Sequence, residues 1–221
     1  MANADTFIKK HYKGLFYNVI YNKYFKNQRR LTKHYNGFDD LKNSGVLSPY
    51  DDIVKIHAKQ YDFDWRLLVA QMHQESRFDP NATSMVGAKG LFQVMPRTAK
   101  EIGIKNVHIP EQGIKASVRY MNWVRDRMIK NDVQKDELIW FTLASYNAGA
   151  GHVRDAMRLA KLKGWRNDIW FGNVEKAMLL LSQPKYAAKA RYGYVRGQEP
   201  VTYIREIRRR FETYQNIFKS E

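Results

Sequence analysis

The carboxylate of Glu75 interrupts an otherwise apolar pattern. The stretch 65–76 is predicted to be an amphipathic helix, and Leu68, Met72 and Glu75 lie on one of its faces because they are spaced four and three residues apart. Burial of an unpaired carboxylate is costly, so such a group tends to keep its proton and its pKa rises. A carboxyl group with a raised pKa can act as a general acid. The structural alternative is a solvated Glu75 that pairs with Arg77 at the rim of this face.

The chemistry depends on whether a second carboxylate lies near Glu75. A hydrolysing glycosidase normally uses two, one as an acid and the other as a nucleophile or base. The candidate Asp79 precedes Pro80, and an Asp in this position is typical of a turn that follows a helix. We therefore predict a structural role for Asp79 and a reaction that needs one carboxylate. A two-carboxylate hydrolase of lysozyme type is the alternative.

The composition restricts the partners and cofactors. The chain has 221 residues, no cysteine and a net charge of +16, which favours a polyanionic partner such as a nucleic acid, an anionic membrane surface or an acidic cell-wall polymer. Aromatic residues make up 14%, and flat Tyr and Trp rings stack on sugars as well as on bases. The histidines His57, His73 and His152 lack the spacing of metal ligands, so no metal and no other cofactor is expected.

The sequence contains no candidate membrane segment. No stretch approaches the roughly 20 apolar residues that a membrane-spanning helix needs. The first residues, 1–5, are not followed by the apolar core of a signal peptide. We therefore expect no transmembrane segment and no export signal in this chain.

The elements that position the candidate residues are predicted to be helical. Apolar residues recur at helical spacing after Ser48, where no strand-like alternation is sustained. Before this point, the segment 7–25 is rich in Tyr, Phe and Asn and lacks periodicity, and 36–40 is typical of a linker. The fold class is therefore predicted to be mainly α-helical. Helices are expected at about 48–60, 65–76, 96–102, 111–129, 135–146, 153–162, 171–182 and 201–218.

Three short motifs occur in order within the helical region. They are Glu-Ser-Arg-Phe-Asp-Pro at 75–80, Gly-Ala-Lys-Gly-Leu-Phe-Gln-Val-Met-Pro at 87–96 and Ala-Ser-Tyr-Asn-Ala-Gly at 144–149. Together, over about 48–211, they resemble the catalytic domain of the soluble lytic transglycosylase family, with the goose-type lysozymes as more distant relatives. The resemblance implies a lysozyme-like helical domain with a substrate cleft.

A narrower match extends toward the C-terminus. Leu-Leu-Leu-Ser-Gln at 179–183 and Tyr-Gly-Tyr-Val-Arg-Gly-Gln-Glu at 192–199 look like the catalytic module of the membrane-bound lytic murein transglycosylase F family. That family carries an upstream domain similar to periplasmic amino-acid-binding proteins, and the segment 7–25 looks like the last part of such a domain. The resemblance implies that 1–45 is the tail of that domain with a linker, and that 46–221 forms the catalytic domain.

The resemblance also implies a reaction. In this family one Glu protonates the oxygen of the β-1,4 bond between N-acetylmuramic acid and N-acetylglucosamine. The same group then draws the proton from the muramic C6 hydroxyl, whose oxygen closes onto C1, and water takes no part. The products carry 1,6-anhydro ends. A group that acts first as an acid and then as a base needs a pKa near the ambient pH, which a half-buried carboxyl provides.

The resemblance assigns the acid and base role to Glu75 and substrate binding to residues of the later motifs. The expected substrate-binding residues are Ser84, Gln93, Met95, Tyr146, Asn147 and Tyr203. Structural roles remain open for some of them. Tyr146 can be a core tyrosine with a satisfied hydroxyl, Met95 can belong to the core, and Ser84 can be an ordinary loop serine.

A non-enzymatic binder is the remaining alternative. A cluster of arginines near the C-terminus would suit a nucleic acid, but no nucleic-acid motif accompanies it and a solvated helix face is the more common reason for such a cluster. The cluster consists of Arg205, Arg208, Arg209 and Arg210. The resemblance implies a protein that binds peptidoglycan glycan strands in the periplasm, and we expect a monomer and no nucleic acid. Association with the outer membrane is expected of the full-length protein.

Overall fold

The computed structural model describes residues 45–129 and 133–218. The chain divides into two compact units, 1–46 and 47–221, and the description that follows concerns the second. The expectation that 1–45 is the tail of an upstream domain falls almost entirely outside the described residues.

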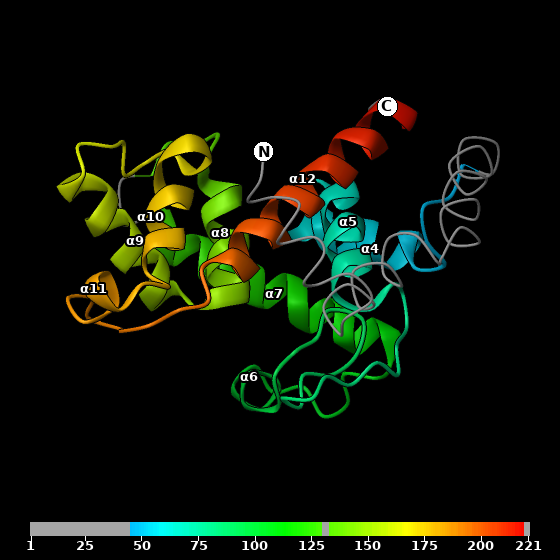
Figure 1. The fold of residues 1–221 in the computed structure, drawn as a ribbon. Coiled ribbons are helices and arrows are strands. Elements are labelled where there is room, and N and C mark those ends of the chain that lie inside the picture. The colour runs from blue at the N-terminus through cyan, green and yellow to red at the C-terminus, as the bar shows by residue number, and fades with distance from the viewer. Residues whose placement is uncertain (1–44, 130–132, 219–221) are drawn as a thin grey trace, which may run out of the picture. The chain divides into compact units, whose positions relative to one another are not determined.

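The second unit is built from helices, as predicted (Figure 1). Among the described residues, extended pairing is limited to isolated bridges that join Thr83 to Lys89 and Lys89 to Val94. The helices are α4 (Asp51–Gln60), α5 (Trp65–Ser76), α6 (Pro96–Glu101), α7 (Pro110–Ile129), α8 (Leu138–Ala148), α9 (Ala150–Leu162), α10 (Glu175–Leu180), α11 (Pro184–Ala187) and α12 (Gln198–Ile217), with a π-helical turn at Trp170–Val174. No helix in the described part of the chain combines the length and the apolar character that crossing a membrane requires.

Most predicted helices form, and the differences are at helix ends and in one additional short helix. The helix expected at 171–182 begins only at Glu175, because Phe171 is extended and Gly172 adopts a φ of +73°. The carboxylate of Glu175 accepts the N–H of Gly172, which ties the kink to the first residue of the new helix. The short helix α11, which was not predicted, begins with Pro184 in the first turn, where proline is favoured.

Helix α4 begins two residues later than its predicted capping pair suggests. Ser48 donates its hydroxyl to the carboxylate of Asp51, and the other oxygen of Asp51 accepts the N–H of Leu47 at 2.7 Å. Ser48 also accepts the N–H of Tyr50. Ser48 and Asp51 therefore fix the start of the helix, as expected of polar residues at this place. The contacts are made by Asp51, the first helical residue, to the preceding residues Leu47 and Ser48, and Ser48 is not the N-cap.

Helix α5 carries Glu75 in its last turn. Its side chains from Leu67 to Met72 are buried, and it packs against α12 and α4 (Figure 1). The carboxylate of Asp64 caps its start by accepting the N–H of Arg66 at 2.9 Å, as predicted for Asp64. Its end is set by Arg77, which adopts a left-handed conformation with a φ of 55°.

Helix α8 passes through the core and delivers Tyr146 and Asn147 at its C-terminal end. The side chains from Phe141 to Ser145 are buried, so the helix is enclosed by protein over this length. It packs against α7, α9 and α12. A buried helix of this kind fixes the position of the residues that follow its enclosed part.

Candidate active site

The carboxyl group of Glu75 meets a phenol from a distant part of the chain. The hydroxyl of Tyr203, in the second turn of α12, donates to Oε1 of Glu75 at 2.6 Å. Tyr203 is only 6% exposed, and its own pKa is raised well above its usual range by burial and by the neighbouring Glu75. The phenol therefore stays protonated at neutral pH and acts as a hydrogen-bond donor to the carboxyl.

The pKa of Glu75 is raised to about 7. The main cause is burial, which disfavours the charged form, and the hydrogen bond from Tyr203 opposes it by stabilising the carboxylate. Part of the residue remains exposed, but protein surrounds the carboxyl group closely enough for burial to dominate. A group with this pKa is present in comparable amounts as acid and as base at neutral pH.

The next residue, Ser76, ties α5 to the loop that carries the second motif. Its hydroxyl lies 2.8 Å from the carbonyl oxygen of Leu91 and 3.3 Å from that of Met72. Leu91 and Phe92 are buried, so this part of the loop belongs to the core. The first and second motifs are thus held together by a hydrogen bond from Ser76, next to Glu75, to Leu91.

Tyr146 connects α8 to the same loop. Its hydroxyl donates to the carbonyl oxygen of Phe92 at 2.9 Å, not to Glu75. Burial and the charge of Glu75 nevertheless raise the pKa of Tyr146 well above its usual value, which places the phenol in the electrostatic environment of the carboxyl. The satisfied hydroxyl matches the structural alternative for Tyr146, and its proximity to Glu75 matches the functional one.

The loop between α5 and α6 is fixed by its own backbone and by Gln93. The side-chain amide of Gln93 donates to the carbonyl oxygens of Gly90 at 2.9 Å and Ala82 at 3.2 Å. Gln93 adopts a φ of 49°, which few side chains tolerate. The amide N–H groups that were expected to contact sugar are therefore used to hold the loop together.

The remaining expected binding residues differ in exposure. Ser84 is partly buried, and its hydroxyl accepts the N–H of Ala88 at 3.0 Å. Met95, immediately before α6, is 43% exposed, so it does not belong to the core. Asn147 is exposed at the end of α8. Met95 and Asn147 are therefore accessible to a ligand.

Asp79 has the structural role predicted for it. It is exposed, and its Oδ1 accepts the N–H of Asn81 at 2.9 Å, which forms the turn after α5. A carboxylate used in this way is poorly placed to activate water at Glu75. Among the described residues, no group of three or more His, Asp or Glu side chains is arranged to hold a metal ion.

Sequence reasoning missed Gln71, which lies one helical turn before Glu75. Gln71 is completely buried, and it lies close enough to the phenol of Tyr203 to lower the pKa of that group. The signal that identified Glu75, a polar residue among buried apolar ones, was also present at Gln71. Tyr120 of α7 was missed as well, and its ring contacts Tyr146 at a centroid distance of 5.4 Å.

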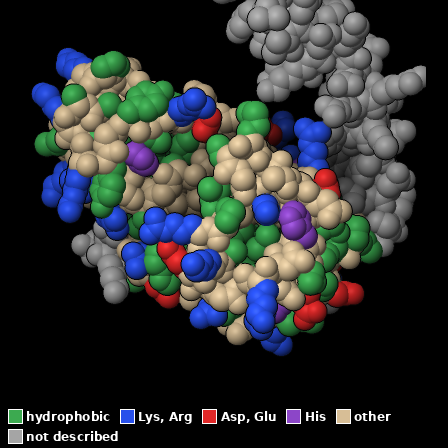
Figure 2. Space-filling model, turned by 90° about the horizontal axis from the view of Figure 1, so that it is seen from below, with side chains coloured by type: hydrophobic (Ala, Val, Ile, Leu, Met, Phe, Trp, Pro, Cys, Tyr) green, Lys and Arg blue, Asp and Glu red, His purple; other side chains and the backbone are tan. Residues whose placement is uncertain are grey.

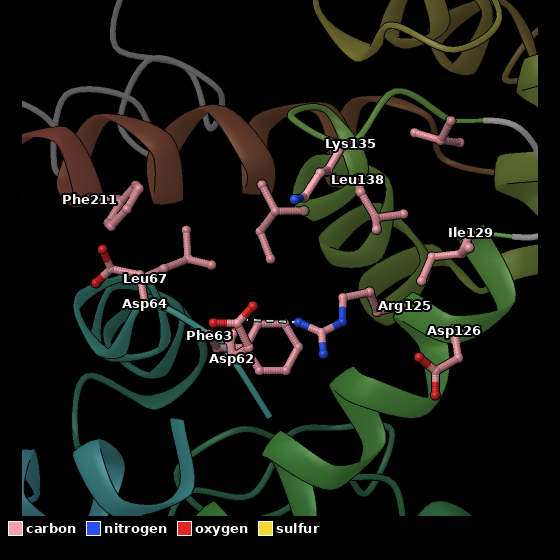
Figure 3. Close-up of a pocket in the computed structure, with 12 residues that line it drawn as sticks. Asp62, Phe63, Asp64, Leu67, Arg125, Asp126, Ile129, Lys135, Leu138 and Phe211 are labelled. Carbon is pink, nitrogen blue, oxygen red and sulfur yellow. Dashed lines mark hydrogen bonds between the residues drawn. The ribbon is translucent and has the colours of Figure 1, made fainter. Parts of the chain in front are cut away.

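A separate cavity of about 610 Å³ opens at the other end of α5 (Figure 3). Leu67, in its wall, precedes Glu75 by eight residues, or about 12 Å along the helix. The guanidinium of Arg125 donates to the carbonyl oxygens of Tyr61 and Asp62, so its hydrogen bonds serve the fold. The cavity is therefore distinct from the site at Glu75. Its wall also includes Phe63, Ile129, Leu138 and Phe211.

Positive charge is concentrated on the lobe that contains α9 to α11. Residues 149–197 include ten Lys and Arg but three Asp and Glu, and Lys and Arg side chains lie around the rim of this lobe (Figure 2). The acidic residues Asp155, Asp168 and Glu175 are each paired with an arginine. The surplus charge is therefore available to an anionic partner.

The fold and the site together define a helical, lysozyme-like domain with a largely enclosed carboxyl group that accepts a hydrogen bond from a buried phenol. The chain belongs to the transglycosylase SLT domain family, whose profile matches residues 52–169. This confirms the predicted family and fold class.

Curated relatives are similar to this chain over most of its length. Membrane-bound lytic murein transglycosylase F of Vibrio vulnificus is 38% identical over 191 residues, which cover 84% of this chain and 36% of that protein. The protein of the same name in Shewanella pealeana is 43% identical over 185 residues, covering 81% of this chain and 38% of that protein. The chain thus spans less than two fifths of the length of these relatives.

Two solved structures share the fold. An inactive mutant of lytic transglycosylase Slt from Pseudomonas aeruginosa superposes with a TM-score of 0.53 at 22% identity, covering 76% of this chain and 24% of that one. The 70 kDa soluble lytic transglycosylase of Escherichia coli gives a TM-score of 0.50, also at 22% identity and with the same coverage.

Proposed function

We propose that this domain is a lytic transglycosylase that cleaves the β-1,4 bond between N-acetylmuramic acid and N-acetylglucosamine in peptidoglycan and leaves 1,6-anhydro ends. One observation carries the proposal. Glu75 has a pKa of about 7 and a hydrogen bond from Tyr203, so one group can serve as both acid and base. Membership of the transglycosylase SLT domain family supports the same activity.

In the first step, protonated Glu75 gives its proton to the glycosidic oxygen as the bond from that oxygen to the muramic C1 breaks. Because Tyr203 occupies Oε1, the proton is best placed on Oε2. The electron deficiency that develops at C1 is stabilised by the N-acetyl group of the substrate itself. Glu75 is left as a carboxylate, which the phenol of Tyr203 stabilises.

In the second step, the carboxylate of Glu75 takes the proton from the C6 hydroxyl of the muramic sugar. The C6 oxygen forms a new bond to C1 and closes the anhydro ring. The proton returns to the enzyme, so Glu75 is again ready to act as an acid. Water is neither consumed nor released, which separates this reaction from hydrolysis.

The surrounding residues are proposed to bind the glycan. Tyr203 holds Glu75, while Met95 and Asn147 are exposed and can contact sugar directly. Ser84 and Gln93 belong to a loop whose internal hydrogen bonds fix its shape, so their contribution combines direct contact with a stable wall. Tyr146 is proposed to line the sugar site beside Glu75.

The proposed partner is the peptidoglycan strand, and the proposed location is the periplasm, with association to the outer membrane in the full-length protein. The positive lobe suits the carboxylates of stem peptides. The domain is proposed to act as a monomer and without nucleic acid. The name of the curated relatives, which describes them as membrane-bound and lytic toward murein, supports this setting.

The test is the mass of the products released from purified peptidoglycan. The anhydro product is lighter by one water than the product of a lysozyme-type muramidase, which is the alternative function. Glu75→Gln keeps the size of the side chain but removes its titration, so it should abolish release. Asp79→Asn is the matched control and should retain activity, because Asp79 serves a turn. The proposal would be refuted if only hydrolytic products were found, or if Glu75→Gln released anhydro products at an undiminished rate.

A further inference from the structure

Gln71 is a polar side chain on the buried, mostly apolar part of α5. It is 0% exposed, and its neighbours on α5 from Leu67 to Met72 are all buried. Within the described residues, neither its amide nitrogen nor its amide oxygen meets a partner with full hydrogen-bond geometry, although the amide lies close enough to the phenol of Tyr203 to lower the pKa of that group. An unsatisfied buried amide is costly, so a side chain of this kind calls for a reason beyond packing.

The position of Gln71 supplies a reason. It lies four residues before Glu75, so both side chains project from the same face of α5. Tyr203 of α12 reaches this face and donates its only hydroxyl hydrogen to Oε1 of Glu75 at 2.6 Å. The phenol oxygen keeps its lone pairs, which can accept a hydrogen bond from a second donor.

The electrostatic effects on Tyr203 have the signs of an ordered chain of bonds. The Glu75 carboxylate, as the acceptor of the phenol hydrogen, raises the pKa of Tyr203. The amide of Gln71 lowers it, which is the effect of an N–H group directed at the phenol oxygen. Donation would therefore run from Gln71 to Tyr203 and from Tyr203 to Glu75.

We propose that Gln71 is a positioning residue whose amide N–H directs the hydroxyl of Tyr203 toward Glu75 and strengthens that bond when Glu75 is ionised. A hydrogen bond accepted by a hydroxyl makes the same hydroxyl a better donor. The effect matters between the two chemical steps, when Glu75 carries its negative charge. The inference rests on the proposed function, because it assigns Gln71 to the group that serves there as acid and base.

Other titratable groups near Glu75 are accounted for. Tyr203 faces it from α12 and Tyr146 is close to it from α8, but the hydroxyl of Tyr146 is bound to the carbonyl oxygen of Phe92. The guanidinium of Arg210 in α12 donates to the side chain of Gln74 at 3.3 Å, so it binds the residue next to Glu75 and not Glu75 itself. The polar chain from Gln71 through Tyr203 is therefore a distinct route by which α5 and α12 act on Glu75.

The test replaces Gln71 with methionine, which has a similar volume and no amide. Loss of the donor weakens the bond from Tyr203 to ionised Glu75, so the pKa of Glu75 should rise. Because Glu75 must start protonated, the alkaline limb of kcat/KM should move to higher pH, by a few tenths of a unit, since one hydrogen bond strengthens the next by about 10–30%.

Two further variants make the result specific. Gln71→Met should cause no further shift in a Tyr203→Phe background, because Gln71 acts through Tyr203. Thr142→Val is the matched control, since Thr142 is also fully buried but its hydroxyl is bound to the carbonyl oxygen of Leu138 within α8. Thr142→Val should leave the alkaline limb of kcat/KM at the same pH as in the wild type. If Gln71→Met folds poorly, Gln71→Leu takes its place in the same series.

A carbon NMR titration of the Glu75 carboxyl provides a readout besides activity. The inference is supported if Gln71→Met raises the pKa of the Glu75 carboxyl in the wild-type background but not in the Tyr203→Phe background. An unchanged pKa, or a shift that persists without the phenol, would overturn it. The proposed function fails separately, through hydrolytic products or an active Glu75→Gln.

Discussion

The burial that raises the pKa of Glu75 should make the domain less stable at neutral pH. The pKa lies at about 7 in the folded protein against an ordinary value of 4.5. Between these values the folded state holds a proton that the unfolded state has lost, so stability falls as the pH rises through this window. A difference of this size corresponds to about 3 kcal/mol, fully lost above the folded pKa. Below pH 4.5 both states are protonated and the penalty disappears.

Glu75→Gln tests this magnitude because the amide resembles the protonated carboxyl and does not titrate. Its carbonyl oxygen can still accept the hydrogen bond from Tyr203. At pH 8 the variant should be more stable than the wild type by up to about 3 kcal/mol, or about 6–12 °C in melting temperature for a domain of this size.

The assay is thermal unfolding of both proteins from pH 4 to pH 8. Titration of all other groups is common to both, so the difference in melting temperature isolates Glu75. The difference should be small at pH 4 and should grow through pH 7. A difference that is independent of pH, or a variant less stable at pH 8, would show that Glu75 is not held in a desolvated environment.

Two further predictions concern the phenol and the loop. Tyr203→Phe removes a hydrogen bond to a charged group, worth about 1.5–3 kcal/mol, so the pKa of Glu75 should rise by about one unit or more. When kcat/KM is measured against pH, the alkaline limb should therefore move to higher pH. An alkaline limb at the same pH as in the wild type would contradict the role of the phenol. Gly90→Ala places a Cβ 2.4 Å from the carbonyl oxygen of Val107, and chemical denaturation should show a stability loss well beyond the roughly 1 kcal/mol expected from backbone strain alone. Gly87→Ala is its control, because Gly87 also has a positive φ but nothing within 4 Å of the added Cβ; equal losses in the two variants would show that the clash is relieved without cost.

Local pattern was enough to predict most of the helical fold. Helix α5 begins and ends where its apolar spacing, the cap Asp64 and the following turn place it. The helix expected at 171–182 was wrong at its start, because the position of the kink depends on a contact distant in sequence. The N–H of Trp170 donates to the carboxylate of Glu137, 33 residues earlier, and no periodicity within the segment contains that information.

The site was predictable to a similar extent. Glu75 was visible as a carboxylate on an apolar face, but Tyr203 is 128 positions further along the chain, so no local pattern records their contact. Only the resemblance to a family connected them. The partner of Tyr146 is a backbone carbonyl, at Phe92, and residue types carry no signal for such an acceptor. Gln71 differs from these cases, since the pattern that identified Glu75 applies equally to it.

The number of hydrogen bonds that the carboxyl of Glu75 accepts determines whether its pKa lies near neutral pH, where it can act as both acid and base. A carboxylate that accepts two or three backbone N–H groups can have a pKa below 2, and a fully buried Glu without such help can reach about 8–9. One phenol donor at 2.6 Å in a buried setting leaves Glu75 between these limits, at about 7. A second donor to the carboxyl would lower its pKa, so little of Glu75 would be protonated at neutral pH. Loss of Tyr203 would instead raise the pKa, so little of Glu75 would be ionised and able to accept a proton at neutral pH. A donor placed behind Tyr203, as inferred for Gln71, adjusts the strength of this one bond and leaves Oε2 free to exchange its proton.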